Sequence, residues 1–196
     1  MANRTHEKES LSTPFSPAHP GFVFLNLAYL LVFSNVAFFY LYPLALDAMG
    51  AGSRTIGWVM GVFSLTAVLS RPFMGRIGGR HGEFRIMSAG MAVMLAATAC
   101  YPFLDRIGPV LYSVRGVHGV GFSAFVAGSF SAVARLFPEE RRAQAYGIVG
   151  ASLMAAVALA PLIGELLLDR FGFDALYGAA CGVVALAWIA VRGSAR

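Results

Sequence analysis

Arg115 and His118 carry charge or proton chemistry into the apolar stretch between residues 107 and 134. They are three residues apart, which puts both on one face of a helix. A charge within hydrocarbon is costly, so such an arginine usually faces a protein interior or a watery cavity and marks a pathway. Histidine titrates near neutrality and can carry a proton. The pair predicts a solute or proton pathway. The structural alternatives are an arginine that snorkels or bonds backbone carbonyls, and a neutral hydrogen-bonded histidine.

Asn26 and Asn35 add polar groups to the first apolar run and need hydrogen-bond partners there. Each either lines the same pathway or joins neighbouring helices. The aromatic residues of this run, Phe38, Phe39 and Tyr42 among them, are interpreted as lipid-facing or interfacial packing.

Enzymatic chemistry is disfavoured by spacing. Ser123 follows His118 by five residues on one helix, about 140° around it, so this histidine is poorly placed to act as its base. Cys100 and Cys181 are isolated, and neither a metal-binding pattern nor a phosphate-binding loop is present. We expect no enzyme activity, no metal and no cofactor, and energy from an ion gradient.

The composition places these residues in a membrane protein. Hydrophobic residues make up 58% of the chain and charged residues 13%, whereas charged residues form about 25% of a typical soluble domain. Residues 21–46 contain no Asp, Glu, Lys, Arg or His, and about 20 apolar residues suffice to cross a bilayer as a helix. The lipid bilayer is therefore the first expected partner.

The apolar runs predict an all-α fold with six transmembrane helices. Residues 1–20 are expected to form a disordered cytoplasmic tail, residues 21–191 the bundle, and residues 192–196 a cytoplasmic end, the start of a missing central loop. The six helices are expected at about residues 21–46, 55–75, 86–104, 107–134, 143–168 and 175–191.

Positive charge sets the predicted orientation. Eleven of the 15 lysines and arginines fall on one side of these spans and three on the other. By the positive-inside rule, both termini are predicted to be cytoplasmic, in a plasma (inner) membrane. This bias also accounts for the net charge of +5 without a nucleic-acid partner.

A weak internal repeat relates the second and fifth helices. Residues 61–75 and 150–164 align at an offset of 89, with Pro72 opposite Pro161 and Gly75 opposite Gly164. This offset divides the helices into two groups of three with opposite topology, as in secondary transporters. A 3+3 inverted repeat is therefore predicted, and coincidence within a biased alphabet is the alternative.

The connector after the second helix, "GRIGGRHGEFR" at residues 75–85, resembles the loop motif of the major facilitator superfamily. Gly75, Arg80 and Gly82 match that motif, and Arg71 with Pro72 before it is also common in the family. Gly79 stands where the family has an Asp that helps to lock the cytoplasmic side. Glu83 and Phe84 replace two basic residues. The glycines 78, 79 and 82 predict a tight turn.

Two further segments carry the resemblance. "RGVHGVGFSA" at residues 115–124 resembles the helix-four motif of the family, with His118 in place of Gln. "ALAPLIGE" at residues 158–165 is similar to the helix-five motif of proton-coupled exporters, through Pro161 and Gly164. The resemblance implies transport of a small solute by alternating access, coupled to protons and directed towards export.

Glycines on the fourth and fifth helices are expected to permit close helix approach. Those on the fourth are Gly116, Gly119, Gly121 and Gly128, and those on the fifth are Gly147 and Gly150.

The family has twelve spans in two halves, and this chain resembles only the first. The resemblance therefore implies a second six-helix half as partner, either the rest of a longer chain or another protomer. Alone, the half would leave Arg115 open to lipid, so the monomer is expected to be inactive. A non-transporting membrane subunit and an inactive truncated remnant are the alternative functions.

Overall fold

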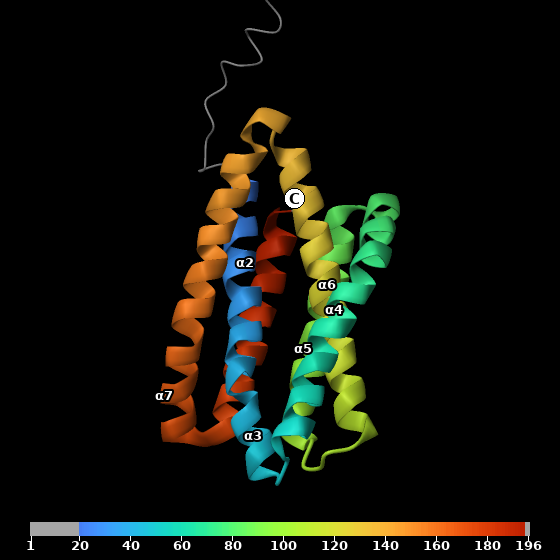
Figure 1. Cartoon of the computed structure of the whole chain (residues 1–196). Helices are drawn as coiled ribbons and strands as arrows, with labels where there is room; N and C mark the ends of the chain where they lie inside the picture. Colours follow the sequence, from blue (N-terminus) through green and yellow to red (C-terminus); the bar gives the residue numbers. More distant parts are fainter. Residues whose placement is uncertain (1–19, 195–196) are drawn as a thin grey trace, which may run out of the picture.

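A computed structural model describes residues 20–194, and helices with short connectors account for this part of the chain (Figure 1). Residues 1–19 of the predicted tail, and residues 195 and 196, lie outside the described residues. The helical elements, in chain order, are α2 (Pro20–Phe38), η1 (Phe39–Leu41), α3 (Tyr42–Ala48), α4 (Ser53–His81), α5 (Glu83–Cys100), η2 (Tyr101–Phe103), α6 (Pro109–Leu136) and α7 (Glu139–Ser194).

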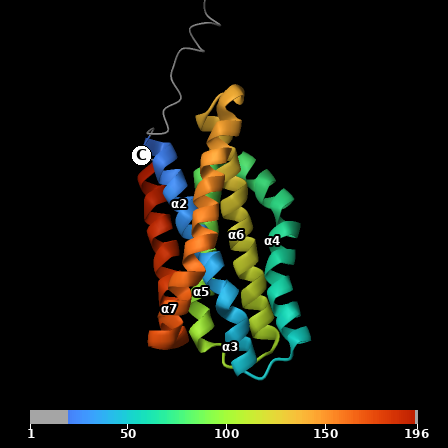
Figure 2. The ribbon, with the colours of Figure 1, turned by 60° about the vertical axis from the view of Figure 1, so that its left-hand side comes forward.

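Five helical segments within residues 20–194 are long and apolar enough to cross a membrane. They are Pro20–Ala48, Ser53–His81, Glu83–Phe103, Pro109–Leu136 and Glu139–Arg192. The last is interrupted at Gly172, whose φ of 78° and ψ of −174° are not helical. The chain reverses direction there, so α7 consists of two antiparallel arms (Figures 1 and 2). The two last predicted helices, residues 143–168 and 175–191, fall on opposite sides of this break.

The turn between α4 and α5 is shorter than the sequence indicated. α4 continues to His81, past the expected end near residue 75, and Gly78 and Gly79 are helical. The predicted three-glycine turn is therefore wrong. Gly82 alone separates the two helices, and its φ of 94° is one that residues other than glycine rarely adopt.

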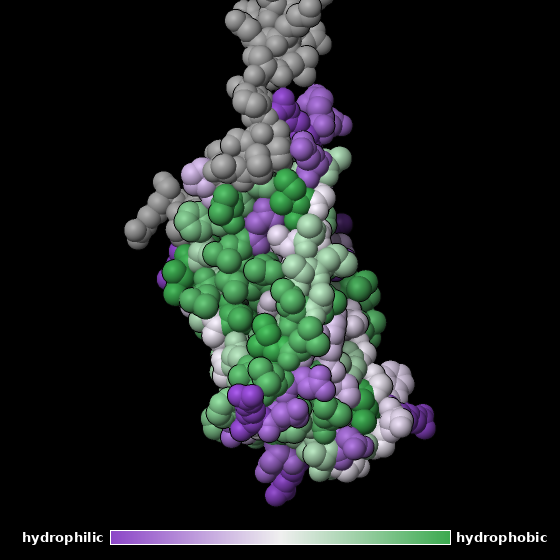
Figure 3. Space-filling view, turned by 90° about the vertical axis from the view of Figure 1, so that its left-hand side faces the viewer, coloured by the Kyte–Doolittle hydropathy of each residue, from purple (hydrophilic) through white to green (hydrophobic). Residues whose placement is uncertain are grey.

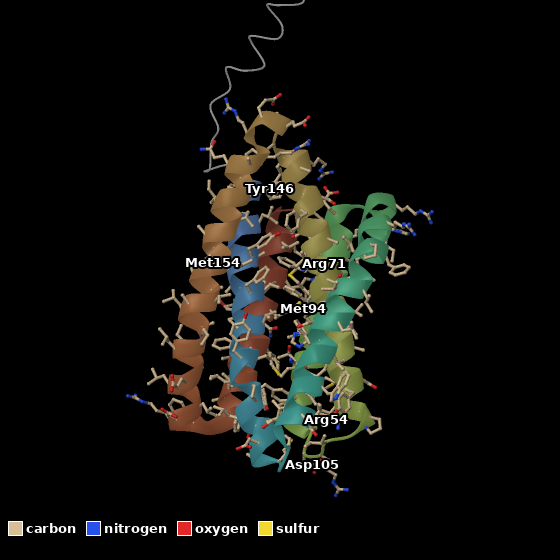
Figure 4. All side chains as sticks on the ribbon, in the orientation of Figure 1. Arg54, Arg71, Met94, Asp105, Tyr146 and Met154 are labelled. Atoms are coloured by element: carbon tan, nitrogen blue, oxygen red, sulfur yellow. The ribbon has the colours of Figure 1, made fainter. Side chains whose placement is uncertain are left out.

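The two ends of the described chain lie at the same end of the bundle (Figure 1). The connector between α4 and α5 and the connector between α6 and α7 lie at this end as well. The opposite end carries Arg54 and Asp105 (Figure 4). Between the two ends, the face formed largely by α7 is a broad band of hydrophobic side chains with hydrophilic groups at its margins (Figure 3).

α6 is the central helix. In its most apolar 18-residue window 67% of residues are buried, against 17% in α4. Its glycines bring neighbouring backbones together: a Cβ on Gly121 would lie 2.8 Å from the carbonyl oxygen of Gly90 in α5. A Cβ on Gly119 would overlap Thr66 and the Phe63 carbonyl of α4. α6 thus packs closely against α4 and α5.

The prediction of close helix approach is confirmed for Gly119 and Gly121 but is wrong for the two glycines of the fifth helix. A Cβ on Gly147 or Gly150 would have no atom within 4 Å, so these residues do not mediate close contact. The first arm of α7 packs instead on α2 and η1, where a Cβ on Gly164 would lie 2.9 Å from Leu41 and 3.0 Å from Phe38. Gly75, its counterpart in the predicted repeat, faces open space.

We predict that Gly121→Ala lowers the free energy of unfolding by about 1–3 kcal/mol, because the added methyl group forces α5 and α6 apart. The measurement is denaturant unfolding in mixed micelles. Gly147→Ala is the control, since its methyl group meets no atom within 4 Å. Equal loss of stability in both variants would contradict the role of α6 as the close-packed centre.

Candidate functional site

Arg115 lies in the interior of the bundle, and its side chain is only 2% exposed. The centre of its guanidinium group is 5.1 Å from the Phe63 ring, 5.3 Å from Tyr42 and 5.4 Å from Phe39. Each such cation–π contact contributes about 0.5–2 kcal/mol. The expectation that Arg115 would be open to lipid in a single half is therefore wrong, because aromatic rings of α3, α4 and η1 enclose it.

The hydrogen bonds of Arg115 are long. Nε donates to the Val59 carbonyl at 3.4 Å, Nη1 to the Tyr101 hydroxyl at 3.4 Å, and Nη2 contacts the Met60 sulfur at 3.3 Å. Among the described residues, no carboxylate lies within ion-pair distance of this guanidinium group. Arg115 therefore brings a buried positive charge that only π faces and neutral acceptors stabilise.

His118 belongs to a hydrogen-bonded chain whose direction is set by Asn35. The Asn35 amide nitrogen donates to the Ala180 carbonyl at 3.0 Å and to the Thr98 hydroxyl at 3.2 Å. The Asn35 oxygen must therefore accept from His118 Nε2, which lies 3.0 Å away. Nδ1 is then the acceptor, and the Tyr101 hydroxyl donates to it at 3.3 Å. This arrangement fits a neutral imidazole.

The chain of hydrogen bonds connects to the arginine. The Tyr101 oxygen accepts from Arg115 while its hydrogen points to His118, so both predicted residues share one partner. Asn35 is fully buried and joins α2 to α5, α6 and α7. The network therefore fixes the ring of His118 and positions Tyr101 beneath the guanidinium group.

Arg115 and His118 line a cavity of about 330 Å³. Tyr40, Met60 and Ser64 lie on its other walls. Because Tyr40 is 52% exposed, the cavity opens at the surface between η1 and α4. A buried cation thus lies within reach of a solute that enters from this surface.

A second cavity, of about 580 Å³, continues along the same face. The two share Val36 and Tyr40 on their walls, so they adjoin each other, and we call the pair the central groove. The second part is rich in aromatic rings, and its one charged residue is Arg71, which lies towards the same end of the bundle as Tyr146 (Figure 4). The rings are those of Tyr29, Phe33, Tyr40, Phe122, Phe130 and Tyr146.

Neither cavity is lined by an acidic residue of the described chain. The two charged groups of the central groove are arginines, Arg115 in one part and Arg71 in the other. The charge on the walls of the groove is therefore positive.

Asn26 is not brought to this site. Its amide nitrogen donates to the Phe22 carbonyl at 3.4 Å, and its oxygen accepts from the Ser152 hydroxyl at 3.2 Å. It lines neither cavity, and it joins α2 to α7.

The loop-motif residues also lie outside the central groove, apart from Arg71. Arg80 is exposed, and Gly82 forms the turn described above. Glu83 and Phe84, which depart from the family motif, both contact Arg135 near the end of α6. The Glu83 carboxylate oxygen Oε1 lies 2.6 Å from Nη2 of Arg135. The guanidinium group of Arg135 lies 5.5 Å from the centre of the Phe84 ring. The departures thus form a local connection between α5 and α6.

Ser123 is buried, and its hydroxyl has no hydrogen-bond partner among the described residues. A nucleophilic serine needs an adjacent base. The geometry therefore gives no support to a hydrolase site.

Sequence reasoning missed the aromatic side chains around Arg115. The sequence indicates lipid-facing or interfacial packing for Phe39 and Tyr42, but they are 4% and 1% exposed. Their spacing of three residues places both on one helical face, yet the sequence offers no sign that this face meets an arginine 70 residues further along. Tyr101 was not singled out at all.

Comparison with known proteins gives one family match and several relatives. The model of the Major Facilitator Superfamily matches residues 22–193. The MFS-type transporter SLC18B1 of Rattus norvegicus is 29% identical, over 76% of this chain and 34% of the relative. The multidrug efflux pump LfrA of Mycolicibacterium smegmatis is 26% identical, over 76% of this chain and 29% of the relative. The chain therefore spans only about a third of the length of these relatives.

Two solved structures share the fold. They are a bacterial homologue of the iron transporter ferroportin in an outward-facing state, with a TM-score of 0.67, and a bacterial homologue of ferroportin in an inward-facing state, with a TM-score of 0.66. Both are 20% identical in sequence. The alignments cover 92% and 91% of this chain, and 46% of the solved chain in each case.

We predict that Asn35→Leu and His118→Leu each lower the free energy of unfolding by about 1–3 kcal/mol, because each leaves a buried polar partner unsatisfied. The double variant is expected to lose less than the sum of the two. A double-mutant cycle in mixed micelles measures the difference. Asn26→Leu with His118→Leu is the control pair, since these residues do not touch. Additive losses for Asn35 and His118 would contradict the network.

Proposed function

Because this chain belongs to the Major Facilitator Superfamily, we propose that it forms a six-helix half of a secondary transporter and contributes the central groove to the solute pathway. The observation that carries the proposal is Arg115, a buried cation that has no described carboxylate partner and lines an open cavity. A membrane protein retains such a costly charge where it serves a pathway.

The proposed topology has six crossings, arranged as a 3+3 inverted repeat with both ends of the chain in the cytoplasm. The reversal of α7 at Gly172 supports the sixth crossing. The arginine-rich connectors lie at the same end of the bundle as the two ends of the described chain, which supports the orientation (Figure 1). Arg76 and Arg80 at the end of α4, with Arg85 at the start of α5, would then anchor the cytoplasmic face.

A second six-helix half is the proposed partner, and it would close the central groove. α4 borders this groove through Met60, Gly61 and Ser64, and it is the least buried of the five candidate spans. The chain aligns about equally well with a related transporter chain in an outward-facing state and with one in an inward-facing state, over 46% of each. These values suit a half that moves as one body during alternating access.

The proposed solute is a small aromatic molecule that is neutral or anionic. Aromatic rings supply stacking surfaces along the groove, and Arg71 and Arg115 supply its charge. A cationic solute would meet two arginines and no carboxylate of the described chain. Arg115 can donate to an anionic group through nitrogen atoms whose present bonds are long.

Export coupled to protons is the proposed direction. It rests on the helix-five residues Pro161 and Gly164 and on relatives that include the efflux pump LfrA and the methylenomycin A resistance protein of Bacillus subtilis. His118 is the proposed proton carrier, since it is the ionisable group hydrogen-bonded to the partner of Arg115.

We predict that cysteines placed at Arg54 and Arg170, in a variant without Cys100 and Cys181, react with a membrane-impermeant maleimide in intact cells. Cysteines at Arg76 and Arg192 are expected to react only after the membrane is opened. The physical reason is that the two pairs lie on opposite sides of the spans. Labelling of the cysteine at position 192 in intact cells would overturn the sixth crossing. Labelling of the cysteine at position 76 in intact cells would overturn the proposed orientation.

We predict that monodisperse monomers in liposomes do not accumulate solute, whereas assemblies with a second six-helix half transport an anionic aromatic dye in preference to a cationic dye of equal size. Arg115→Met is expected to reduce the flux by about tenfold or more, and Arg115→Lys less, because lysine keeps the charge. Arg170→Gln is the control, because Arg170 does not line either part of the central groove.

Uphill transport by monomers would contradict the need for a second half. A preference for the cationic dye would overturn the assignment of solute class. If no assembly transports any dye, a non-transporting membrane subunit or an inactive remnant becomes the better description.

A further inference from the structure

A second groove lies on another side of the bundle, between the start of α5 and the end of α7. It has a volume of about 400 Å³ and does not share a lining residue with the central groove. We call it the lateral groove. The residues that matter here are Arg85, Ser88, Ala89, Ala92, Trp188 and Arg192.

The mouth of the lateral groove is positively charged. Arg85 and Arg192 come from different helices, and both are exposed. Among the described residues, no acidic side chain lines the groove. The guanidinium group of Arg192 lies 4.3 Å from the centre of the Trp188 ring. The aromatic face holds this charge at the groove, where a negatively charged group can meet both arginines.

The lining of the groove is largely apolar. Ala89 and Ala92 leave room along α5, one turn apart on the same side, and Trp188 forms the facing wall. The indole nitrogen of Trp188 donates to the Ser88 hydroxyl at 2.6 Å, which fixes the ring in place. A polar head site thus continues into a slot lined by small apolar side chains.

The level of the groove along the bundle matches a lipid headgroup. Arg85 follows the connector between α4 and α5, and Arg192 is near the end of α7, so both lie at the arginine-rich end (Figure 1). Tryptophan and arginine are typical of the membrane–water interface. Basic pockets between transmembrane helices at the cytoplasmic side recognise anionic headgroups.

We propose that the lateral groove binds one anionic phospholipid. The phosphate pairs with Arg85 and Arg192, and an acyl chain lies along Ala89 and Ala92 against Trp188. The bound lipid would bridge α5 to the second arm of α7, and so stabilise the packing of the half independently of solute transport. Free phosphate would satisfy the arginines but would leave the apolar slot empty, which is why a lipid is the better occupant.

Native mass spectrometry of the full chain in detergent, with added phosphatidylglycerol, tests the proposal. One phosphatidylglycerol molecule is expected to remain bound per chain, with phosphatidylcholine retained far less. Retention is expected to fall by about tenfold or more in the Arg85→Gln, Arg192→Gln double variant. The Arg85→Lys, Arg192→Lys double variant is expected to keep most of the bound phosphatidylglycerol, because lysine keeps the positive charge. Arg76→Gln with Arg170→Gln has the same net charge and is expected to bind normally.

A second variant keeps the proposal falsifiable if loss of arginine disturbs folding. Ala92→Trp fills the slot without changing charge, and it is expected to abolish lipid retention and the gain in thermal stability that phosphatidylglycerol gives. Equal retention of phosphatidylcholine would overturn the proposal, as would full retention in Ala92→Trp. Displacement of the lipid by inorganic phosphate would reveal a free-anion site, and a dimer lost in Ala92→Trp would reveal an interface between copies. Either result would also overturn it.

Discussion

The organisation of the described helices depends on how they accommodate a guanidinium charge in their interior. Transferring a cation from water to a low-dielectric interior is costly unless other groups stabilise it. Around Arg115 the three aromatic faces of Phe39, Tyr42 and Phe63 supply most of this stabilisation, and Tyr101 adds a hydrogen bond. Because these rings come from separate helices, the charge can be accommodated only when η1, α3, α4 and α6 are packed together.

Close packing of α6 makes this geometry possible. The backbones of α4 and α5 approach α6 at glycines, where any side chain would collide. Asn35 then joins α2 and α7 to the same centre through its bonds to His118 and the Ala180 carbonyl. The site is therefore positioned by helices rather than by loops.

The two grooves assign arginines to different tasks. In the central groove, charge lies next to aromatic rings and suits a solute. In the lateral groove, Arg85 and Arg192 lie at the end of the bundle above a slot of small side chains, and suit a lipid. A third use appears where Arg135 pairs with Glu83 and joins α5 to α6 at their ends. The three arrangements differ in their place in the bundle and in their neighbours, although each uses the same residue type.

From the sequence alone, the membrane class, the family and the shared face of Arg115 and His118 could be predicted, because each depends on local hydropathy, motif spacing or helical period. Three features depend on the fold: the rings that surround Arg115, the helix contact at Gly121 rather than at Gly147, and the approach of Asn35 but not Asn26 to the site. Contacts between distant helices depend on which faces meet, and a hydrophobic run that is apolar on all sides does not specify that face.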